Sequence, residues 1–336
     1  MSERNAGGTG RRKRRRGGSP NLVSRASEPA RAGNRRTRRT DGVRDPRTAP
    51  QPAFDPNVFC LRYCACSHAL PPSWSEIRRT LQNLDGMLLD SGSAEQGQPC
   101  FRYLNLDTGV EACFRGYLTE VPDEVGLTFE MNLPRPGYFA HEALPLAVMV
   151  ARELRLDTRP HGPDGPTGSP HPSKEGLLTI WLEQNTQARK NRGPAPAARA
   201  DELEAAWEYL TLREELFWRY GRRGVAVPRV EFVRRRKTGE VLRMCRWARL
   251  APSIFPPVDL VYLEDPPPPL KDGRILSFDQ LSQAAHRWLR YVPQPIYHRT
   301  YLETSPSEEF LGILATLKTR TMRSYESVAV EELDEI

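Results

Sequence analysis

Apolar, aromatic and β-favouring residues are grouped in short runs between Cys100 and Asn132, separated by polar turns, and this pattern predicts a β-hairpin that extends into a meander. Two runs rich in aromatic and β-favouring residues flank Asp107–Gly109, where glycine supplies the positive φ of a tight turn. A third run, Leu127–Leu133, extends the hairpin, and Met87–Leu89 is a candidate short strand before it. The meander is the clearest structural signal in the chain, but it indicates no chemistry.

Elements on both sides of this meander predict an α+β domain over residues 54–157. Val58–Ala65 has apolar residues on both faces of a strand, and Ser73–Leu84 has a helical apolar stripe that starts with a capping box. A second helix is predicted over Gly137–Leu156, where Pro145 favours either a start two residues before it or a kink. The order β-α-β-β-β-α predicts helices on one face of a mainly antiparallel sheet.

A second α+β domain is predicted over residues 177–336, after a linker at residues 158–176 that carries five prolines. This domain is also built on a hairpin, with its turn at Lys237–Gly239. Helices are predicted over Leu177–Asn191, Asp201–Tyr220, Ser277–Leu289 and Ser307–Leu317, and strands over Arg229–Val233, Val241–Trp247, Val258–Leu263 and Ile296–Leu302. The two domains share no residue pattern strong enough to establish a duplication.

The first 53 residues form a predicted disordered, Arg-rich tail. Residues 1–50 hold 15 basic and 4 acidic residues, a net charge of +11, and almost no large apolar residues that could offset backbone entropy. The rest of the chain holds 34 basic and 38 acidic residues, a net charge of −4. The tail is therefore a candidate arm for phosphate backbones or acidic protein surfaces, a nuclear-localisation signal, or simply a solvated extension.

Composition sets further limits on the class of protein. Only six of the 49 basic residues are lysine, a bias typical of a GC-rich genome, so many arginines need not have been selected for a ligand. There is no run of 18 apolar residues that would predict a membrane span, and no apolar segment follows the arginines as in a secretory signal. We expect a cytoplasmic protein, or a nuclear one if the source is eukaryotic.

A metal site is the first alternative to consider for the cluster Cys60, Cys64, Cys66 and His68. On one strand, alternate residues share a face but stand about 6.6 Å apart, so Cys60 and Cys66 are separated by roughly 20 Å. One zinc ion with bonds near 2.3 Å cannot gather them, and no second cysteine pair follows at a zinc-binding spacing. The pattern therefore favours small thiols buried in a core strand, with no metal.

The remaining cysteines suggest one pairing. Cys100 and Cys113 face each other across the predicted hairpin, where a disulfide is geometrically feasible. An intracellular protein would keep both thiols reduced, so we expect no disulfide there. Cys245 has no evident partner.

Few residues indicate catalysis. His141–Glu142 at a helix start resembles the beginning of a zinc-protease motif, but the position of the second histidine holds Pro145, so the ligand pair is missing. A glutamate at a helix N-terminus is more often placed there by the helix dipole. Asp107 with Asn105 and Asn132 are candidates for a polar mouth at one end of the sheet, although turn chemistry also explains Asn105 and Asp107.

The main basic run outside the tail lies on the second hairpin tip. Arg234, Arg235, Arg236 and Lys237 are placed where a phosphate contact is common, and equally where charge protects an edge strand. The candidate binding residues in the tail are Arg11, Arg12, Lys13, Arg14, Arg15, Arg16, Arg35, Arg36, Arg38 and Arg39. The tryptophans fit core stripes better than base-stacking platforms.

These observations favour a non-catalytic interaction protein, such as an adaptor, an inhibitor or an immunity-type binding partner, with a flexible basic arm. The sequence indicates no catalytic residue, metal or cofactor, and a protein is the expected partner. The alternative is a nucleic-acid-associated protein that uses the Arg-rich tail. A third hypothesis, an enzyme of unrecognised type, requires a cleft that joins Asp107, His141 and Glu142.

Overall fold

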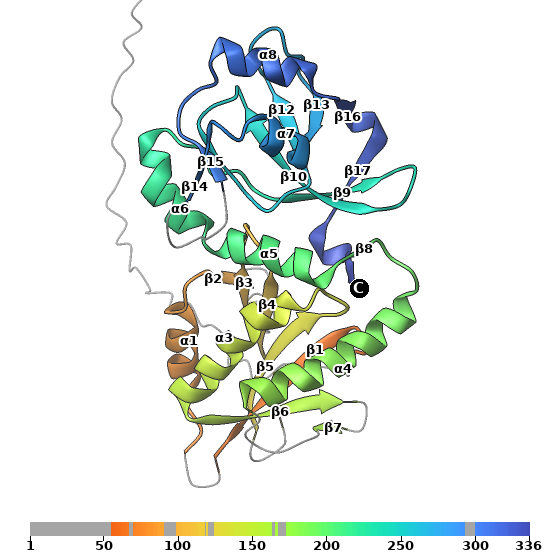
Figure 1. Cartoon of the computed structure of the whole chain (residues 1–336). Coiled ribbons are helices and arrows are strands. Elements are labelled where there is room, and N and C mark those ends of the chain that lie inside the picture. The colour runs from red at the N-terminus through yellow and green to blue at the C-terminus, as the bar shows by residue number, and fades with distance from the viewer. Residues whose placement is uncertain are drawn as a thin grey trace, which may run out of the picture. The chain divides into compact units, whose positions relative to one another are not determined.

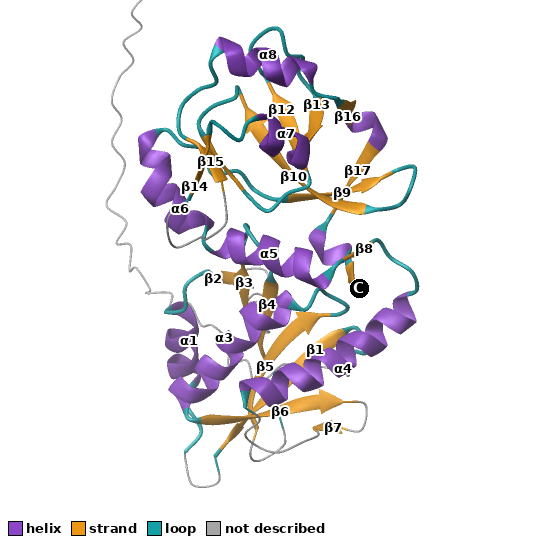
Figure 2. Ribbon diagram, viewed as in Figure 1, coloured by secondary structure: helices purple, strands orange, loops and turns teal. Residues whose placement is uncertain are grey.

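The computed structural model describes residues 55–66, 70–90, 99–117, 119, 124–162, 165–166, 173–292 and 300–336. Internal contacts divide the chain into residues 1–42 and 43–336, and all described residues belong to the second unit. The predicted tail therefore lies outside them. Helices and mainly antiparallel sheets alternate along the described chain, which confirms the α+β class (Figures 1 and 2).

The predicted meander forms the centre of a seven-stranded sheet. Its strands are β1 (Val58–Ala65), β2 (Met87–Asp90), β3 (Cys100–Leu104), β4 (Glu111–Gly116), β5 (Glu124–Asn132), β6 (Leu156–Gly162) and β7 (Gly165–Pro166). They lie in the order β2-β3-β4-β5-β1-β6-β7, with every neighbouring pair antiparallel. Gly109 has a φ of 76° in the β3–β4 turn, as the sequence predicts for a tight hairpin.

The two faces of this sheet differ because strand residues alternate between them. One face carries a row of apolar residues that pair across four strands, Leu61, Phe129, Phe114 and Phe101. Helix α3 (Tyr138–Leu154) covers this face, since the Tyr63 hydroxyl donates to the Ala147 carbonyl at 3.0 Å. Helices α1 (Trp74–Gln82) and α4 (Lys174–Arg192) pack against α3, and Ser73 and Glu76 form the predicted capping box.

Helix α3 confirms the helix predicted over residues 137–156, and it runs through Pro145 rather than starting two residues before it, so the carbonyl of His141 loses its usual backbone donor. One expectation for this region is wrong. Residues 156–162, assigned in part to a linker, form strand β6, which pairs with β1 through partners such as Tyr63 and Thr158. Strand β1 would otherwise expose unpaired backbone groups at its outer edge, and the single proline of β6, Pro160, is tolerated so near the sheet edge.

The second predicted hairpin also forms, within a six-stranded sheet. Its strands are β9 (Glu231–Arg235), β10 (Val241–Ala248), β12 (Leu260–Glu264), β13 (Arg274–Ser277), β16 (Arg320–Thr321) and β17 (Tyr325–Val328), in the order β16-β13-β12-β10-β9-β17. Only β10 and β12 are parallel. The chain order and direction of these strands differ from those of the first sheet.

Smaller elements complete the described chain. They are helices α5 (Ala200–Thr211), α6 (Arg213–Tyr220), α7 (Phe278–Ala284) and α8 (Glu308–Thr316), the 3-10 helices η2 (Gly221–Arg223), η3 (Met322–Ser324) and η4 (Val330–Glu332), and strands β8 (Ala197–Ala198), β11 (Ser253–Phe255), β14 (Leu289–Tyr291), β15 (Thr300–Leu302) and β18 (Asp334–Glu335). Strands β11, β15 and β14 form one small sheet, and β8 pairs with β18.

Two of the predicted helix boundaries need correction. The single helix expected over residues 201–220 is divided at Leu212, after which the Arg213 guanidinium donates to the Val227 carbonyl at 3.0 Å. The helix predicted to end at residue 289 ends at Ala284, because residues 289–291 pair with β15. Of the strand predicted over residues 296–302, only 300–302 fall within the described residues, as β15.

Candidate functional site

Glu142, one of the three residues required for the enzyme hypothesis, is a hydrogen-bond hub in the first part of α3. Its Oε1 accepts from the Tyr103 hydroxyl at 2.8 Å, the Asn105 amide at 2.8 Å and the Thr108 hydroxyl at 2.9 Å. Its Oε2 accepts from the Trp207 indole at 2.7 Å. Burial and the neighbouring carboxylate raise the pKa of Tyr103. These four donors make Glu142 a clamp that fixes the β3–β4 turn against α3 and α5.

Asp107 is held by two arginines. Its Oδ1 accepts from the Arg213 guanidinium at 2.8 Å and from the Arg229 Nε at 2.8 Å. Asn105 Oδ1 accepts the backbone N–H groups of Asp107 and Thr108 at 3.0 and 3.3 Å, which is the turn chemistry anticipated for this residue. The two guanidinium contacts tie the turn to α6 and to the segment that precedes β9.

Asp107 lines a cleft that we call the turn cleft, with a volume of about 480 Å³. Its lining residues are Leu106, Asp107, Thr108, Gly109, Tyr138, Leu203, Ala206, Trp207, Leu210, Arg229, Val230, Glu231, Phe232, Arg246, Ser327, Val328 and Val330. Glu142 and His141 are not among them, and the His141 side chain is exposed and lies with its ring 6.3 Å from that of Trp207. The structure therefore does not gather the three residues in one cleft.

Apolar and polar groups both line the turn cleft, and charged side chains are among them. Tyr138 and Trp207 stack with ring centroids 6.1 Å apart, while their polar atoms bond the Thr108 carbonyl and Glu142. They therefore present ring surface rather than polar atoms to the cleft. At the rim, the Leu106 side chain is 73% exposed and the Arg229 side chain is 52% exposed.

The sequence did not indicate this cleft. Trp207 fits the core stripe of a helix, and its contact with Glu142 joins residues that are 65 positions apart. The residues around Val328 lie beyond the last predicted helix, which ends at Leu317, and no strand was predicted there. The helical spacing of Leu203, Trp207 and Leu210 was the only available signal, and it does not distinguish a cleft wall from a core.

Ion pairs offset about half of the positive charge of the basic hairpin tip. Arg234 and Arg236 both pair with Glu326 on β17, and Arg235 pairs with Glu240 at 2.6 Å. Within the part of the chain that the structure describes, Lys237 is exposed and has no carboxylate partner. The ten candidate cations of the tail lie outside the described residues.

A buried ion pair lies on the face of the seven-stranded sheet opposite α3. Arg62 donates to Glu124 at 3.1 Å, and their side chains are 6% and 1% exposed. Tyr117 and Thr119 donate to the second Glu124 oxygen at 2.7 and 2.9 Å, and the Arg62 guanidinium lies 3.1 Å from His161 Nε2. Because arginine can only donate, Nε2 must accept, which requires a neutral imidazole. Burial and the Arg62 cation lower the pKa of His161.

The cysteines of β1 are buried, as the strand interpretation predicts. Burial, with a smaller contribution from Glu130, raises the pKa of Cys60 to about 12, so it is an inert thiol at neutral pH. The Cys66 thiol donates to Asp157 at 3.2 Å, and His68 lies outside the described residues. Across the described ranges, no three His, Cys, Asp or Glu side chains form a group that could hold a metal ion.

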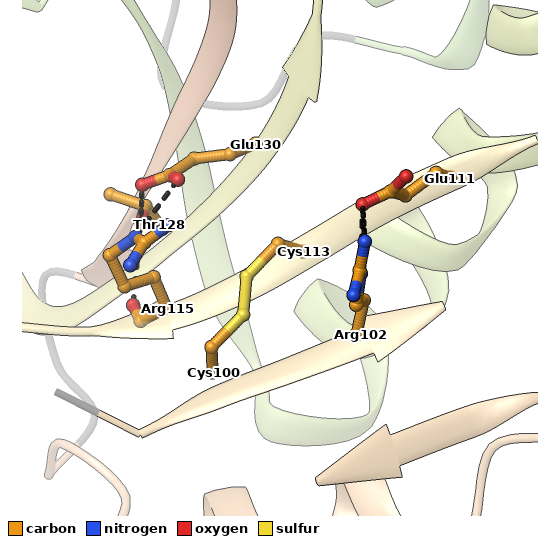
Figure 3. Close-up of a disulfide and its surroundings, with 7 residues drawn as sticks. All are labelled: Cys100, Arg102, Glu111, Cys113, Arg115, Thr128 and Glu130. Carbon is orange, nitrogen blue, oxygen red and sulfur yellow. Dashed lines mark hydrogen bonds and ion pairs between the residues drawn. A yellow bond between two sulfur atoms is a disulfide. The ribbon is translucent and has the colours of Figure 1, made fainter. Parts of the chain in front are cut away.

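Cys100 and Cys113 form a disulfide between β3 and β4, contrary to the expectation of two reduced thiols (Figure 3). They are diagonal neighbours in the hairpin register, with Cα atoms 6.2 Å apart, within the usual range for a disulfide. Salt bridges flank the bond on the same sheet face, Arg102 with Glu111 at 2.7 Å and Arg115 with Glu130 at 3.0 Å.

Comparisons with protein-family models, with curated proteins and with solved structures give no match for this chain. Among the described residues, no helix combines the length and the apolar character needed to cross a membrane. The function must therefore be argued from the site alone.

Proposed function

We propose that this is a non-catalytic interaction protein that holds a segment of a partner protein in the turn cleft. The observation that carries the proposal is the cleft itself, a cavity of about 480 Å³ whose lining combines apolar and aromatic residues with charged ones. Cavities of this size and lining are typical of binding sites. Tyrosine, tryptophan and arginine are also the residue types that contribute most binding energy at protein interfaces.

The lining indicates what the partner segment contains. Apolar residues such as Leu203, Ala206 and Val328 form the walls, so an apolar or aromatic side chain suits the interior. Arg229 lies at the rim with half of its side chain exposed, although Asp107 accepts from its Nε. A carboxylate next to the inserted side chain would pair with the remaining guanidinium donors.

The same geometry argues for binding rather than catalysis. Glu142 accepts four hydrogen bonds and Asp107 two, all from side chains of the protein. A general base needs a lone pair directed at the substrate, whereas both Glu142 oxygens and Asp107 Oδ1 accept from internal donors. Their arrangement supports a structural role in shaping the cleft.

Selection from a displayed peptide library against the purified protein tests the proposal, with dissociation constants measured by fluorescence polarisation. Leu106→Asp at the rim and Ser327→Trp on the exposed wall should each weaken peptide binding about tenfold or more. Ser324→Trp, also exposed but outside the cleft lining, is the matched control and should bind as the wild type does. The proposal fails if no peptide binds saturably, or if both cleft variants retain full affinity.

Nucleic-acid association through the tail is the second candidate function. The net charge of +11 over residues 1–50, against −4 for the rest of the chain, favours it. The ion pairs on Arg234, Arg235 and Arg236 weaken the case for the hairpin tip as a second contact. We propose a cytoplasmic location for either function, or a nuclear one in a eukaryotic source.

A further inference from the structure

The six-stranded sheet is curled so strongly that its two edges meet. In a flat sheet the edge strands β16 and β17 would lie about 24 Å apart, because neighbouring strands are spaced by about 4.8 Å. Only η3, Met322–Ser324, separates them along the chain, and the four peptide units from Thr321 to Tyr325 reach at most about 14 Å. The Arg320 guanidinium accordingly lies 3.1 Å from the Tyr325 hydroxyl, joining side chains from opposite edges.

The inner face of this curled sheet is a small apolar core of its own. Val233, Met244, Leu260, Ile275 and Tyr325 pack together there and are almost completely buried. The register places Arg320 beside Ile275 and Arg235 beside Tyr325, so both arginines share the inner face. The sheet is therefore a nearly closed barrel, with these arginines at one end of its interior.

A cavity of about 320 Å³ opens at this end, which we call the barrel mouth. Its lining includes three cationic side chains, Arg235, Lys318 and Arg320, together with Tyr325. Leu260 and Ile275 contribute apolar floor. The mouths of β-barrels are among the preferred positions of small-molecule sites.

Some hydrogen-bond donors at the barrel mouth have no acceptor in the described part of the protein. In the described part of the chain, neither Lys318 nor Arg320 has a carboxylate within 4.0 Å, and the buried Nε of Arg235 has no acceptor. The Tyr325 oxygen accepts from Arg320, so the O–H of the tyrosine can still donate to another acceptor. Lys318, Arg320 and Tyr325 line the cavity and can offer it donors, whereas Arg235 Nε is buried.

Two carboxylates also line the cavity and must be weighed against the cations. Asp259 is fully engaged, since both of its oxygens accept from Arg243, at 2.8, 2.9 and 3.2 Å. Asp279 is the other carboxylate in the lining, and its negative charge offsets part of the positive charge of Lys318 and Arg320. With Arg235 offset by Glu240 at 2.6 Å, the mouth retains an excess of positive charge.

We infer that the barrel mouth binds a small organic phosphate. The phosphate oxygens accept from Lys318, Arg320 and the Tyr325 hydroxyl, and the ester group lies over the apolar residues Leu260 and Ile275. Arginine and lysine are the side chains that most strongly favour phosphate oxygens. The inference is independent of the turn cleft, because the two cavities share no lining residue.

Isothermal titration calorimetry with phenyl phosphate and inorganic phosphate at low ionic strength tests this site. Wild-type protein should bind phenyl phosphate saturably and at least fivefold more tightly than inorganic phosphate, because only the ester covers the apolar floor. Binding should strengthen between pH 5.5 and 7.5, as the phosphate becomes a dianion with a second pKa of about 6. Equal affinity for both probes would overturn the organic ester as the ligand.

Variants that remove the same charge at different places distinguish a specific phosphate site from general electrostatic attraction to the protein. Lys318→Gln/Arg320→Gln should weaken phenyl phosphate binding at least tenfold, whereas Lys271→Gln/Arg223→Gln, which removes the same charge elsewhere, should change it less than twofold. Tyr325→Phe keeps the ring and should cost about threefold to tenfold. Thermal melts establish that each variant is folded. No saturable binding by the folded wild type, or equal losses in the two double variants, would overturn the inference.

Discussion

Single carboxylates in this protein connect segments that are distant in sequence. Glu142 joins the β3–β4 turn to α5, and Asp107 joins the same turn to Arg213 and Arg229. The sequence placed Glu142 at a helix start, where the helix dipole is a sufficient local explanation. Its hydrogen-bond partners come from residues 103–108 and 207, and no local pattern connects such segments.

Removing the Glu142 carboxylate should measurably lower the free energy of unfolding. Glu142→Ala leaves the donors of Tyr103, Asn105, Thr108 and Trp207 without their acceptor, and unsatisfied buried donors cost about 1–3 kcal/mol each when water cannot reach them. These groups are partly buried, so we expect a total loss of about 2–4 kcal/mol in urea unfolding. Glu153→Ala, exposed on the same helix, should change stability by less than about 0.5 kcal/mol. A loss in Glu142→Ala no larger than the control would contradict the clamp.

His161 predicts a dependence of stability on pH. Its folded pKa is lowered by burial and by Arg62, with an opposing contribution from Glu124, relative to an unfolded value of about 6.5. The unfolded state therefore binds more protons than the folded state in this range, so stability is fully present above pH 6.5 and falls as pH drops below it. The slope approaches about 1.4 kcal/mol per pH unit at most.

The matched variants for this prediction are His161→Gln and His141→Gln. Glutamine at position 161 still offers Arg62 an oxygen acceptor but does not titrate, so its unfolding free energy should depend less on pH between 6.5 and 5. His141 is exposed, and its replacement should leave the wild-type slope unchanged. If the unfolding free energies of wild type and His161→Gln depend equally on pH, His161 is not the cause of the pH dependence.

At the scale of elements, the runs of β-favouring residues and the turn residues were sufficient to predict the structure where contacts are local. Both hairpins, with turns at Gly109 and Gly239, were predictable because glycine and the flanking β-favouring runs act within about 15 residues. Strands β6 and β17 were missed, since their pairing depends on open edges of β1 and β9 that are distant in sequence. The curled sheet could not be predicted either, because β17 was not recognised as a strand.

The disulfide links two strands that are already paired, and it should still contribute stability. A closed loop of about 15 residues corresponds to about 3 kcal/mol in the chain-entropy description, and Cys100 and Cys113 are 13 positions apart. Reduction with dithiothreitol should therefore lower the melting temperature by several degrees. Cys113→Ser should melt near the reduced wild type and show no response to the reductant. Mass spectrometry of the alkylated, unreduced protein gives an independent check, since the bonded pair takes up no label.

At the scale of the whole chain, the core crosses the predicted domain boundary. One continuous apolar cluster includes Leu61 and Phe114 from the first sheet and Trp181, Trp247 and Phe310 from residues 177–336. The two sheets were predictable as separate sheets, because each has its own hairpin. Their shared core was not, since the apolar stripes of α4 and α5 do not specify which sheet they cover. Independent folding of residues 54–157 stays a prediction.

The charge asymmetry between tail and remainder leads to a test of nucleic-acid association. If six to ten of the 15 cations in residues 1–50 contact phosphates, counterion release should reduce affinity for duplex DNA about 10³- to 10⁵-fold between 50 and 200 mM salt. Such binding should show little sequence preference, because phosphate contacts carry no base information. Protein lacking residues 1–53 should lose nearly all of it. Residual or sequence-selective binding by the truncated protein would instead place a nucleic-acid site on the folded part. Absence of binding by the full chain at low salt would assign the tail to an acidic protein partner or to no binding function.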